Sequence, residues 1–358
     1  STATYAIATY SLRSGAGAIG QVKTTTTTLP ITWSGVRIFY VKAIDLAGNE
    51  SAEGSTSVAV VQAAAPTITV SYTGQNAVLS WSEINGTTKT RFYQVKRGDA
   101  VVATLQSTSY TTRVDWTGSQ TFSVRSVDAN GNLGTSASVT VTPTAPPAPT
   151  VQNTFVGEQV QLFWNAVQGS LDTAYYQVRR GSTFASATVL SEIKSTTFNL
   201  KVNWSGTQRF WVVAFDAVGA QGTEAFQDVT VTAPMAPMIS QQVIDNNVLL
   251  RWTDTTQTLP IVYYELRRGT TWAGGTSVGT KQGLFTTVFE TVSGTYTYWL
   301  AGIDTAGNVG TPSSVSALVN QPPDYVLRSD INSTFSGTLT NLTSNAGGLL
   351  ATVNTTET

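Results

Sequence analysis

The side chains that could do chemistry in this sequence lie at turns and along candidate strands. Four turns share the pattern Asp-x-x-Gly, and they begin at Asp45, Asp128, Asp216 and Asp304. Carboxylate and amide oxygens are ligands for calcium, but one acid per turn is fewer than a calcium site needs. We therefore expect plain turns, in which the aspartate hydrogen-bonds nearby backbone and the glycine takes a positive φ. The sequence predicts no metal site.

Two Arg-Arg-Gly corners are a second candidate, for contacts with phosphate or lipopolysaccharide. They are Arg179-Arg180-Gly181 and Arg267-Arg268-Gly269. The chain has 20 Lys+Arg against 21 Asp+Glu and a formal net charge of −1, so no broad positive field attracts an anionic partner. We favour solvated strand ends over an anion site, and we expect no binding to nucleic acid.

A third candidate is a set of aromatic side chains expected to face outward from a sheet. Its members are Tyr175, Trp211, Tyr263 and Trp299. Such side chains could pack against a second protomer, stack on sugars, or be half covered by their own neighbouring strands. All three interpretations remain open from the sequence.

Catalysis is not expected in this chain. Its 358 residues include no cysteine and no histidine, which excludes disulfides, thiolate nucleophiles, Cys-based zinc sites and Ser-His-Asp catalysis. No glycine-rich phosphate loop precedes a helix, and no pair of acids lies in an evident cleft. No segment reaches the ~18 consecutive apolar residues of a membrane span. We therefore predict no enzyme activity, no catalytic residues, no cofactor and no membrane insertion.

The elements that must position these residues recur along the chain. An aromatic pair leads into a basic-Gly turn at residues 92–98, 175–181 and 263–269. An aromatic-Ser/Thr-Gly corner occurs at Trp33, Trp116 and Trp204, and its fourth copy begins with Val292. These landmarks and the Asp turns share spacings of 83 and 88 residues. Three landmarks with common spacings predict a tandem repeat.

A tryptophan in an apolar run marks the predicted core of each full repeat. It occurs as Trp81, Trp164 and Trp252. One spacing earlier this residue would precede Ser1, so we expect the first repeat to lack its first two strands. We expect the chain to be a piece of a longer protein, or the missing strands to be supplied from elsewhere.

Each repeat is predicted to be an antiparallel β-sandwich. Every second side chain before the Asp turn lines up on one face and tapers from large to small, as in Phe122, Val124 and Ser126, and this period of two indicates a half-buried strand. About seven short strands separated by Gly/Asn turns are typical of a two-sheet sandwich. The predicted divisions are a partial repeat at 1–63, full repeats at 64–145, 146–233 and 234–320, and a Ser/Thr-rich, non-sandwich extension at 321–358. The joints are Pro-rich, which favours a semi-rigid rod.

The repeats resemble fibronectin type III domains in their bacterial and phage form. The likeness rests on the Tyr-x-Val/Leu-x-Arg-Gly strands and on the Phe/Tyr-x-Val-x-Ala-x-Asp-x-x-Gly-Asn pattern, over about residues 1–320. The segment Pro322-Pro323-Asp324-Tyr325 and the residues after it are similar to tail-tip or central-fibre proteins of long-tailed phages. That resemblance implies a homotrimeric structural and adhesive part of a virion tail, which would contact other tail proteins and a host receptor or polysaccharide. The alternative is a fibronectin type III spacer array of a bacterial secreted carbohydrate-active enzyme or surface adhesin, located outside the cell.

Overall fold

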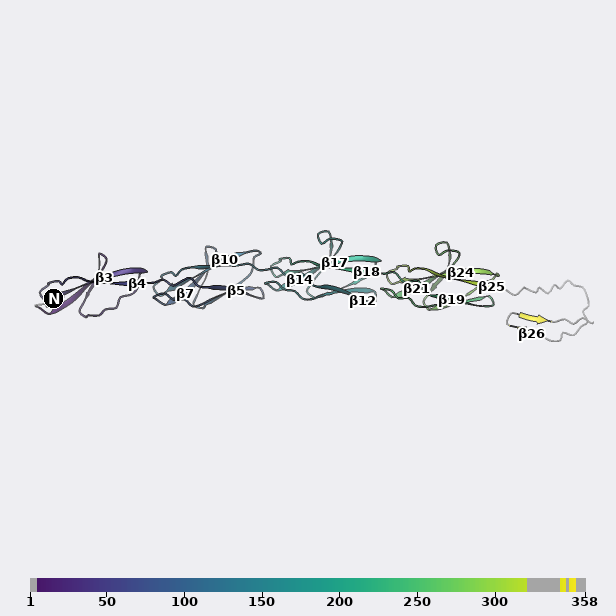
Figure 1. Cartoon of the computed structure of the whole chain (residues 1–358), viewed down its shortest axis with the longest axis horizontal. Helices are drawn as coiled ribbons and strands as arrows, with labels where there is room; N and C mark the ends of the chain where they lie inside the picture. Colours follow the sequence, from purple (N-terminus) through teal and green to yellow (C-terminus); the bar gives the residue numbers. More distant parts are fainter. Residues whose placement is uncertain (1–4, 321–341, 346–347, 352–358) are drawn as a thin grey trace, which may run out of the picture.

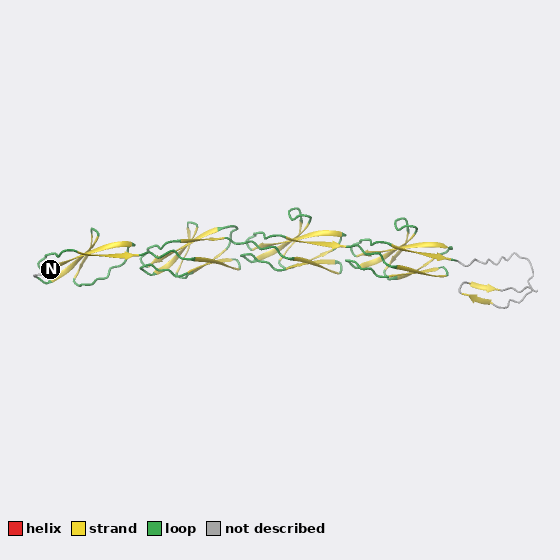
Figure 2. Ribbon diagram, viewed as in Figure 1, coloured by secondary structure: helices red, strands yellow, loops and turns green. Residues whose placement is uncertain are grey.

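The computed structural model describes residues 5–320, 342–345 and 348–351, and every regular element in them is a β-strand. Four units made of β-strands follow one another along a single line, with the N-terminus at one end (Figure 1). Loops and turns connect all the strands, and no helix occurs among the described residues (Figure 2). Accordingly, the described part of the chain has no helix that could cross a membrane.

Repeat two shows the arrangement of a full unit. One sheet has the order β5-β6-β9, with strands Ile68–Thr73, Asn76–Trp81 and Ser109–Arg113. The other has the order β11-β10-β7-β8, with strands Ala137–Val141, Gln120–Asp128, Thr90–Arg97 and Ala100–Leu105. All neighbouring strands are antiparallel. This three-plus-four arrangement is a fibronectin type III-like β-sandwich, and the predicted all-β class is confirmed.

Repeats three and four have the same topology. In repeat three the sheets are β12-β13-β16 and β15-β14-β17-β18, and in repeat four they are β19-β20-β23 and β22-β21-β24-β25. The strands of repeat three are Val151–Val156, Gln159–Trp164, Thr173–Arg180, Thr188–Ile193, Thr197–Lys201, Gly206–Asp216 and Ala225–Val231 (β12 to β18). The strands of repeat four are Ile239–Ile244, Asn247–Trp252, Ile261–Arg268, Thr276–Lys281, Phe285–Phe289, Gly294–Asp304 and Ser313–Val319 (β19 to β25).

The core of each full repeat lies between its two sheets. Trp81, Trp164 and Trp252 are 6%, 5% and 5% exposed. Each indole meets the edge of a tyrosine ring from the opposite sheet, with ring centroids 5.5 or 5.6 Å apart. The alternation in β10 leaves Phe122 and Val124 fully buried. The period-two pattern therefore places one face of the strand in the core, as the pleat requires.

In residues 5–63, the described part of repeat one, the strands form only the four-stranded sheet. Its order is β2-β1-β3-β4, with strands Gly17–Val22, Ile7–Ser14, Gly35–Asp45 and Gly54–Val60. Residues 26–30 correspond to β9 of repeat two but form no strand, because the strand with which they would pair is absent. Val41 is 41% exposed, whereas the equivalent Val124 is fully buried. The described residues of this repeat, 5–63, therefore form none of the three strands of a second sheet, one more missing strand than the sequence predicted.

The described part of the C-terminal extension is a short antiparallel hairpin. It consists of β26 (Leu342–Asn345) and β27 (Gly348–Ala351). The prediction for the rest of residues 321–358 lies outside the described residues.

Candidate functional site: the joints between repeats

The linkers between repeats are held by backbone hydrogen bonds from the following repeat. After the Asp turns of repeats two, three and four, the N–H of Thr135, Thr223 or Thr311 donates to a linker carbonyl, at 3.0, 3.1 and 3.0 Å. The acceptors are the carbonyl oxygens of Ala63, Pro146 and Pro234. The same bond at all three joints fixes each linker against the next sandwich.

Glycine precedes each of these threonines because the linker passes very close. A Cβ atom on Gly222 would lie 2.4 Å from the Pro146 carbonyl oxygen, and one on Gly310 would lie 2.6 Å from that of Pro234. Gly134 has the same neighbour at 3.1 Å, the Ala63 oxygen. Contacts this close leave no room for a side chain, so glycine is required for the approach of the backbone.

A second set of bonds comes from the loop after the core tryptophan. Linker N–H groups of Val61, Thr144 and Thr232 donate to hydroxyl oxygens of that loop at 2.8, 2.9 and 3.0 Å. The acceptors are Thr87, Ser170 and Thr258. Each linker is thus bound by two different loops of the next repeat, and this limits rotation at the joint.

Two leucines carry apolar contacts across the joints. Leu171 belongs to repeat three but lies in the buried cluster of repeat two, and it is fully buried. Leu259 belongs to repeat four but lies in the cluster of repeat three, 1% exposed. The Asp turns add Val218 and Ala306, which pack against the same preceding clusters. The core of each of these two repeats is therefore completed by its successor.

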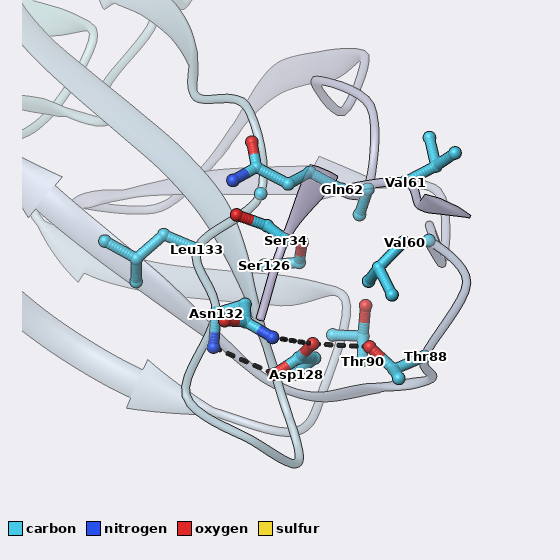
Figure 3. A pocket seen from close by; sticks show the side chains of 13 residues that line it. Ser34, Val60, Val61, Gln62, Thr88, Thr90, Ser126, Asp128, Asn132 and Leu133 are labelled. Atoms are coloured by element: carbon cyan, nitrogen blue, oxygen red, sulfur yellow. Dashed lines mark hydrogen bonds between the residues drawn. The ribbon is translucent and has the colours of Figure 1, made fainter. Parts of the chain in front are cut away.

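The first joint has a threonine at the leucine position. The Thr88 hydroxyl donates to an Asp128 carboxylate oxygen of its own repeat, and both residues line a small pocket with Val60 (Figure 3). Burial would raise the pKa of Asp128, but hydrogen bonds from Thr88 and Asn132 hold it below its usual value. Repeat one has no closed sandwich core, so a leucine here would have no apolar socket to fill.

The Asp turns themselves have the expected plain form. The Asp304 carboxylate accepts N–H bonds from Ala306 and Asn308 and a third bond from the Asn308 amide, all at 2.9 Å. The described residues contain no group of three or more acids that could hold a metal ion. Repeat three is an exception, because Ala220 replaces the asparagine. Asp216 is 2% exposed, and its Oδ2 has no hydrogen-bond partner.

The Arg-Arg-Gly corners lie on the sheets and are engaged with neighbouring side chains. Arg179 donates to Gln177 at 2.6 Å and lies over the Phe184 ring. Arg267 donates to Glu265 at 2.8 Å and lies over the Trp272 ring. These contacts favour strand-end packing over an anion site.

The outward-facing aromatic residues are partly covered by their own repeats. The Trp211 indole donates to the Gly181 carbonyl at 2.9 Å, and the Trp299 indole donates to the Gly269 carbonyl at 3.0 Å. Phe184 and Phe226 flank Trp211 with ring planes inclined by 69° and 55°. Rings at these angles do not form a flat platform for a sugar.

The two tyrosines of this set lie on the first strand of the same sheets. Tyr175 stacks on Phe215 with centroids 4.9 Å apart and planes 8° apart. Tyr263 is half-buried opposite Ile303. Cover by neighbouring strands therefore accounts for much of the surface of all four aromatic residues.

The joint residues were missed in the sequence, although a signal for them was present. Leu171 and Leu259 are 88 residues apart, the spacing of the repeat, and so are Thr223 and Thr311. Each leucine lies in a loop outside the alternating strands, at the same position of its repeat. An apolar residue that recurs at such a position indicates a contact with a neighbouring repeat.

Comparisons with known proteins identify two curated relatives from the bacterium Cellulomonas fimi. Exoglucanase B is 28% identical over 274 residues, a match that covers 70% of this chain and 25% of the relative. Exoglucanase A is 30% identical over 268 residues, a match that covers 68% of this chain and 30% of the relative. The chain therefore matches less than a third of either enzyme. Each match is longer than two repeats together, so it extends across at least one joint.

Two further comparisons add little. No protein-family model matches the chain. A match to the crystal structure of the chicken CNTN1 FN1-FN3 domains covers 72% of this chain and 99% of the chicken chain, with 14% identity and a TM-score of 0.25. The assignment of the fold rests on the strand topology described above.

Proposed function

We propose that this chain is a stiff spacer array in a secreted bacterial carbohydrate-active enzyme or surface adhesin. It would hold other parts of that protein at a set distance and direction. The observation that carries the proposal is the joint: two loops bind each linker, and Leu171 and Leu259 enter the preceding cores. A flexible tether needs none of these contacts.

The relatives support the carbohydrate-active setting over the phage tail. Both share a long match with this chain and are named exoglucanases. The matched part is a minor fraction of each enzyme, which fits an accessory array better than a catalytic domain. Self-association as a trimer came with the tail interpretation and stays a prediction.

The test compares length with stiffness in the complete protein that contains the array. Deleting residues 146–233 removes one whole repeat and places Leu259 against the leucine socket of repeat two. Leu171→Ser with Leu259→Ser keeps the length but loosens two joints. We expect both changes to lower activity on an insoluble polysaccharide and to leave activity on a soluble oligosaccharide unchanged.

Two results would overturn the proposal. Equal activity of both variants and the parent on the insoluble polymer would show that neither length nor stiffness matters. A loss on the soluble substrate as well would indicate a direct contribution to catalysis. As a control, Leu46→Ala changes a leucine that is 72% exposed and should leave both activities unchanged.

A further inference from the structure

The downstream end of repeat four differs from the ends that receive a leucine. In repeat two the socket includes Val114 and Trp116, which are 1% and 7% exposed and share a cluster with Leu171. In repeat three Val202 and Trp204 occupy these places beside Leu259. Both sockets thus pair a valine with a tryptophan.

Repeat four has Glu290 and Val292 at these two positions. The backbone fixes the correspondence, since the N–H of Val202 donates to the Glu158 carbonyl and that of Glu290 donates to the equivalent Asn246 carbonyl. A carboxylate replaces the valine, and a small side chain replaces the tryptophan. The apolar wall that would surround a leucine is therefore missing.

Two side chains of repeat four bind the Glu290 carboxylate. Glu290 is 3% exposed, and it accepts a bond from the Tyr298 hydroxyl at 2.7 Å and one from Arg268 at 2.5 Å. Repeat three has Phe210 in place of Tyr298, without a hydroxyl. A buried carboxylate needs such partners, and Arg268 and Tyr298 supply two of them from within the repeat.

The corner residue no longer covers the core. Val292 is 62% exposed, whereas Trp116 is 7% exposed. The hydroxyl of Tyr296 donates to the Val292 carbonyl at 2.8 Å, and Arg268 lies over the Tyr296 ring. The polar groups of Tyr296 and Arg268 therefore lie at the downstream end of the repeat.

We infer that repeat four is the terminal cap of the stiff array. Its downstream end is closed by the Glu290–Tyr298–Arg268 network and does not accept a leucine from another fibronectin-type repeat. Repeat arrays commonly end in units with a polar outer surface. An incoming leucine would remove water from the charged pair without offering a hydrogen bond. The rod thus has a direction and a defined end, and this inference does not depend on the carbohydrate role.

The test adds a fifth repeat to the full chain. A second copy of residues 232–319 is inserted after Val319, so that the new joint has the linker Thr232-Ala233-Pro234 and the Leu259 of the native third joint. The chain has no cysteine, so spin labels can be attached at introduced cysteines alone. Ser240→Cys in each copy reports on the new joint. Gln152→Cys with Ser240→Cys in the parent chain reports on the native one, from equivalent exposed positions in β12 and β19.

We expect a narrow distance distribution across the native joint and one at least twice as wide across the new joint. A distance distribution across the new joint as narrow as that across the native joint would overturn the inference. A second five-repeat chain carries Glu290→Val, Val292→Trp and Tyr298→Phe in the first copy, which installs the residues of repeat three. In that chain we expect a narrower distance distribution across the new joint. A folded chain whose distribution stays wide would contradict the assignment of the socket. If the triple variant does not fold, the comparison of the two unmodified joints decides alone.

Discussion

Leu171 belongs to repeat three by sequence but shares a buried core cluster with Trp116 of repeat two. The leucine lies on the loop that follows the core tryptophan of its own repeat, and the tryptophan lies at the corner of the preceding one. The boundary between the two units in sequence is therefore not the boundary between their cores. As a result, the stability of repeat two depends on residues of repeat three.

The first prediction concerns Leu171→Ala. Truncating a buried leucine in a core typically costs about 2–5 kcal/mol. We expect most of this loss to appear in repeat two, which does not contain the residue. Hydrogen exchange read by mass spectrometry should show faster exchange in β9 and β10 than in β13 and β14.

The control for this variant is Leu133→Ala, which removes a leucine that is 42% exposed. A surface change of this kind is usually within about 0.5 kcal/mol. Faster exchange confined to repeat three in Leu171→Ala would contradict the shared core.

A second prediction concerns the Asp turn of repeat three. Ala220→Asn supplies the amide that Asp45, Asp128 and Asp304 receive from their asparagines. A hydrogen bond to a buried charged group contributes about 1.5–3 kcal/mol. We expect a higher urea midpoint for repeat three, by an amount corresponding to about 1 kcal/mol or more.

The reverse change, Asn132→Ala, provides the comparison. It should destabilise repeat two by leaving one oxygen of Asp128 with fewer donors. Stabilisation by Asn132→Ala, or destabilisation by Ala220→Asn, would show that this amide does not support the turn.

A third prediction tests the close passage of the linker. A Cβ atom on Gly169 would lie 2.2 Å from the Thr144 carbonyl oxygen. Gly169→Ala should therefore displace the linker and weaken the bonds between Thr144 and Ser170. Limited proteolysis should cut residues 142–147 at least several times faster than in the parent chain.

Gly283→Ala is the matched control, since a Cβ there meets no atom within 4 Å. It should leave the cleavage pattern unchanged. Equal resistance of Gly169→Ala and the parent would indicate that the linker has room to spare.

A fourth prediction is a dependence on alkaline pH. Burial raises the pKa of Tyr264 to about 12, and its hydroxyl donates to the Asp254 carboxylate at 2.7 Å. The folded pKa lies above the unfolded value of about 10. The associated stability is complete below about pH 10 and is lost as the pH rises through the folded pKa. The urea midpoint of repeat four should therefore fall as the pH rises from about 10 to about 12.

Burial also raises the pKa of Tyr298 in this repeat, so Tyr264→Phe removes one of two such groups and should make this part of the pH profile less steep. Ultraviolet absorbance of tyrosinate would follow the titration directly. A profile as steep in Tyr264→Phe as in the parent would assign the effect to other groups.

The sequence was sufficient to predict the sandwich repeat because its landmarks are local. Strand alternation, Gly turns and the core tryptophans each depend on residues close in the chain. The joints depend on residues from two repeats, and Leu171 is preceded by polar loop residues that give no periodic signal. The unpaired segment 26–30 was missed for a similar reason. Its strand character depends on a partner strand and not on its own composition.

The central claim is that the joints are stiff, and a distance distribution across the second joint tests it most directly. Thr69→Cys and Gln152→Cys place spin labels at equivalent exposed positions in β5 and β12. We predict one narrow distance peak in the full chain, which broadens on adding Leu171→Ser. A broad distribution in the chain without Leu171→Ser would contradict the account, because the two repeats would then move independently.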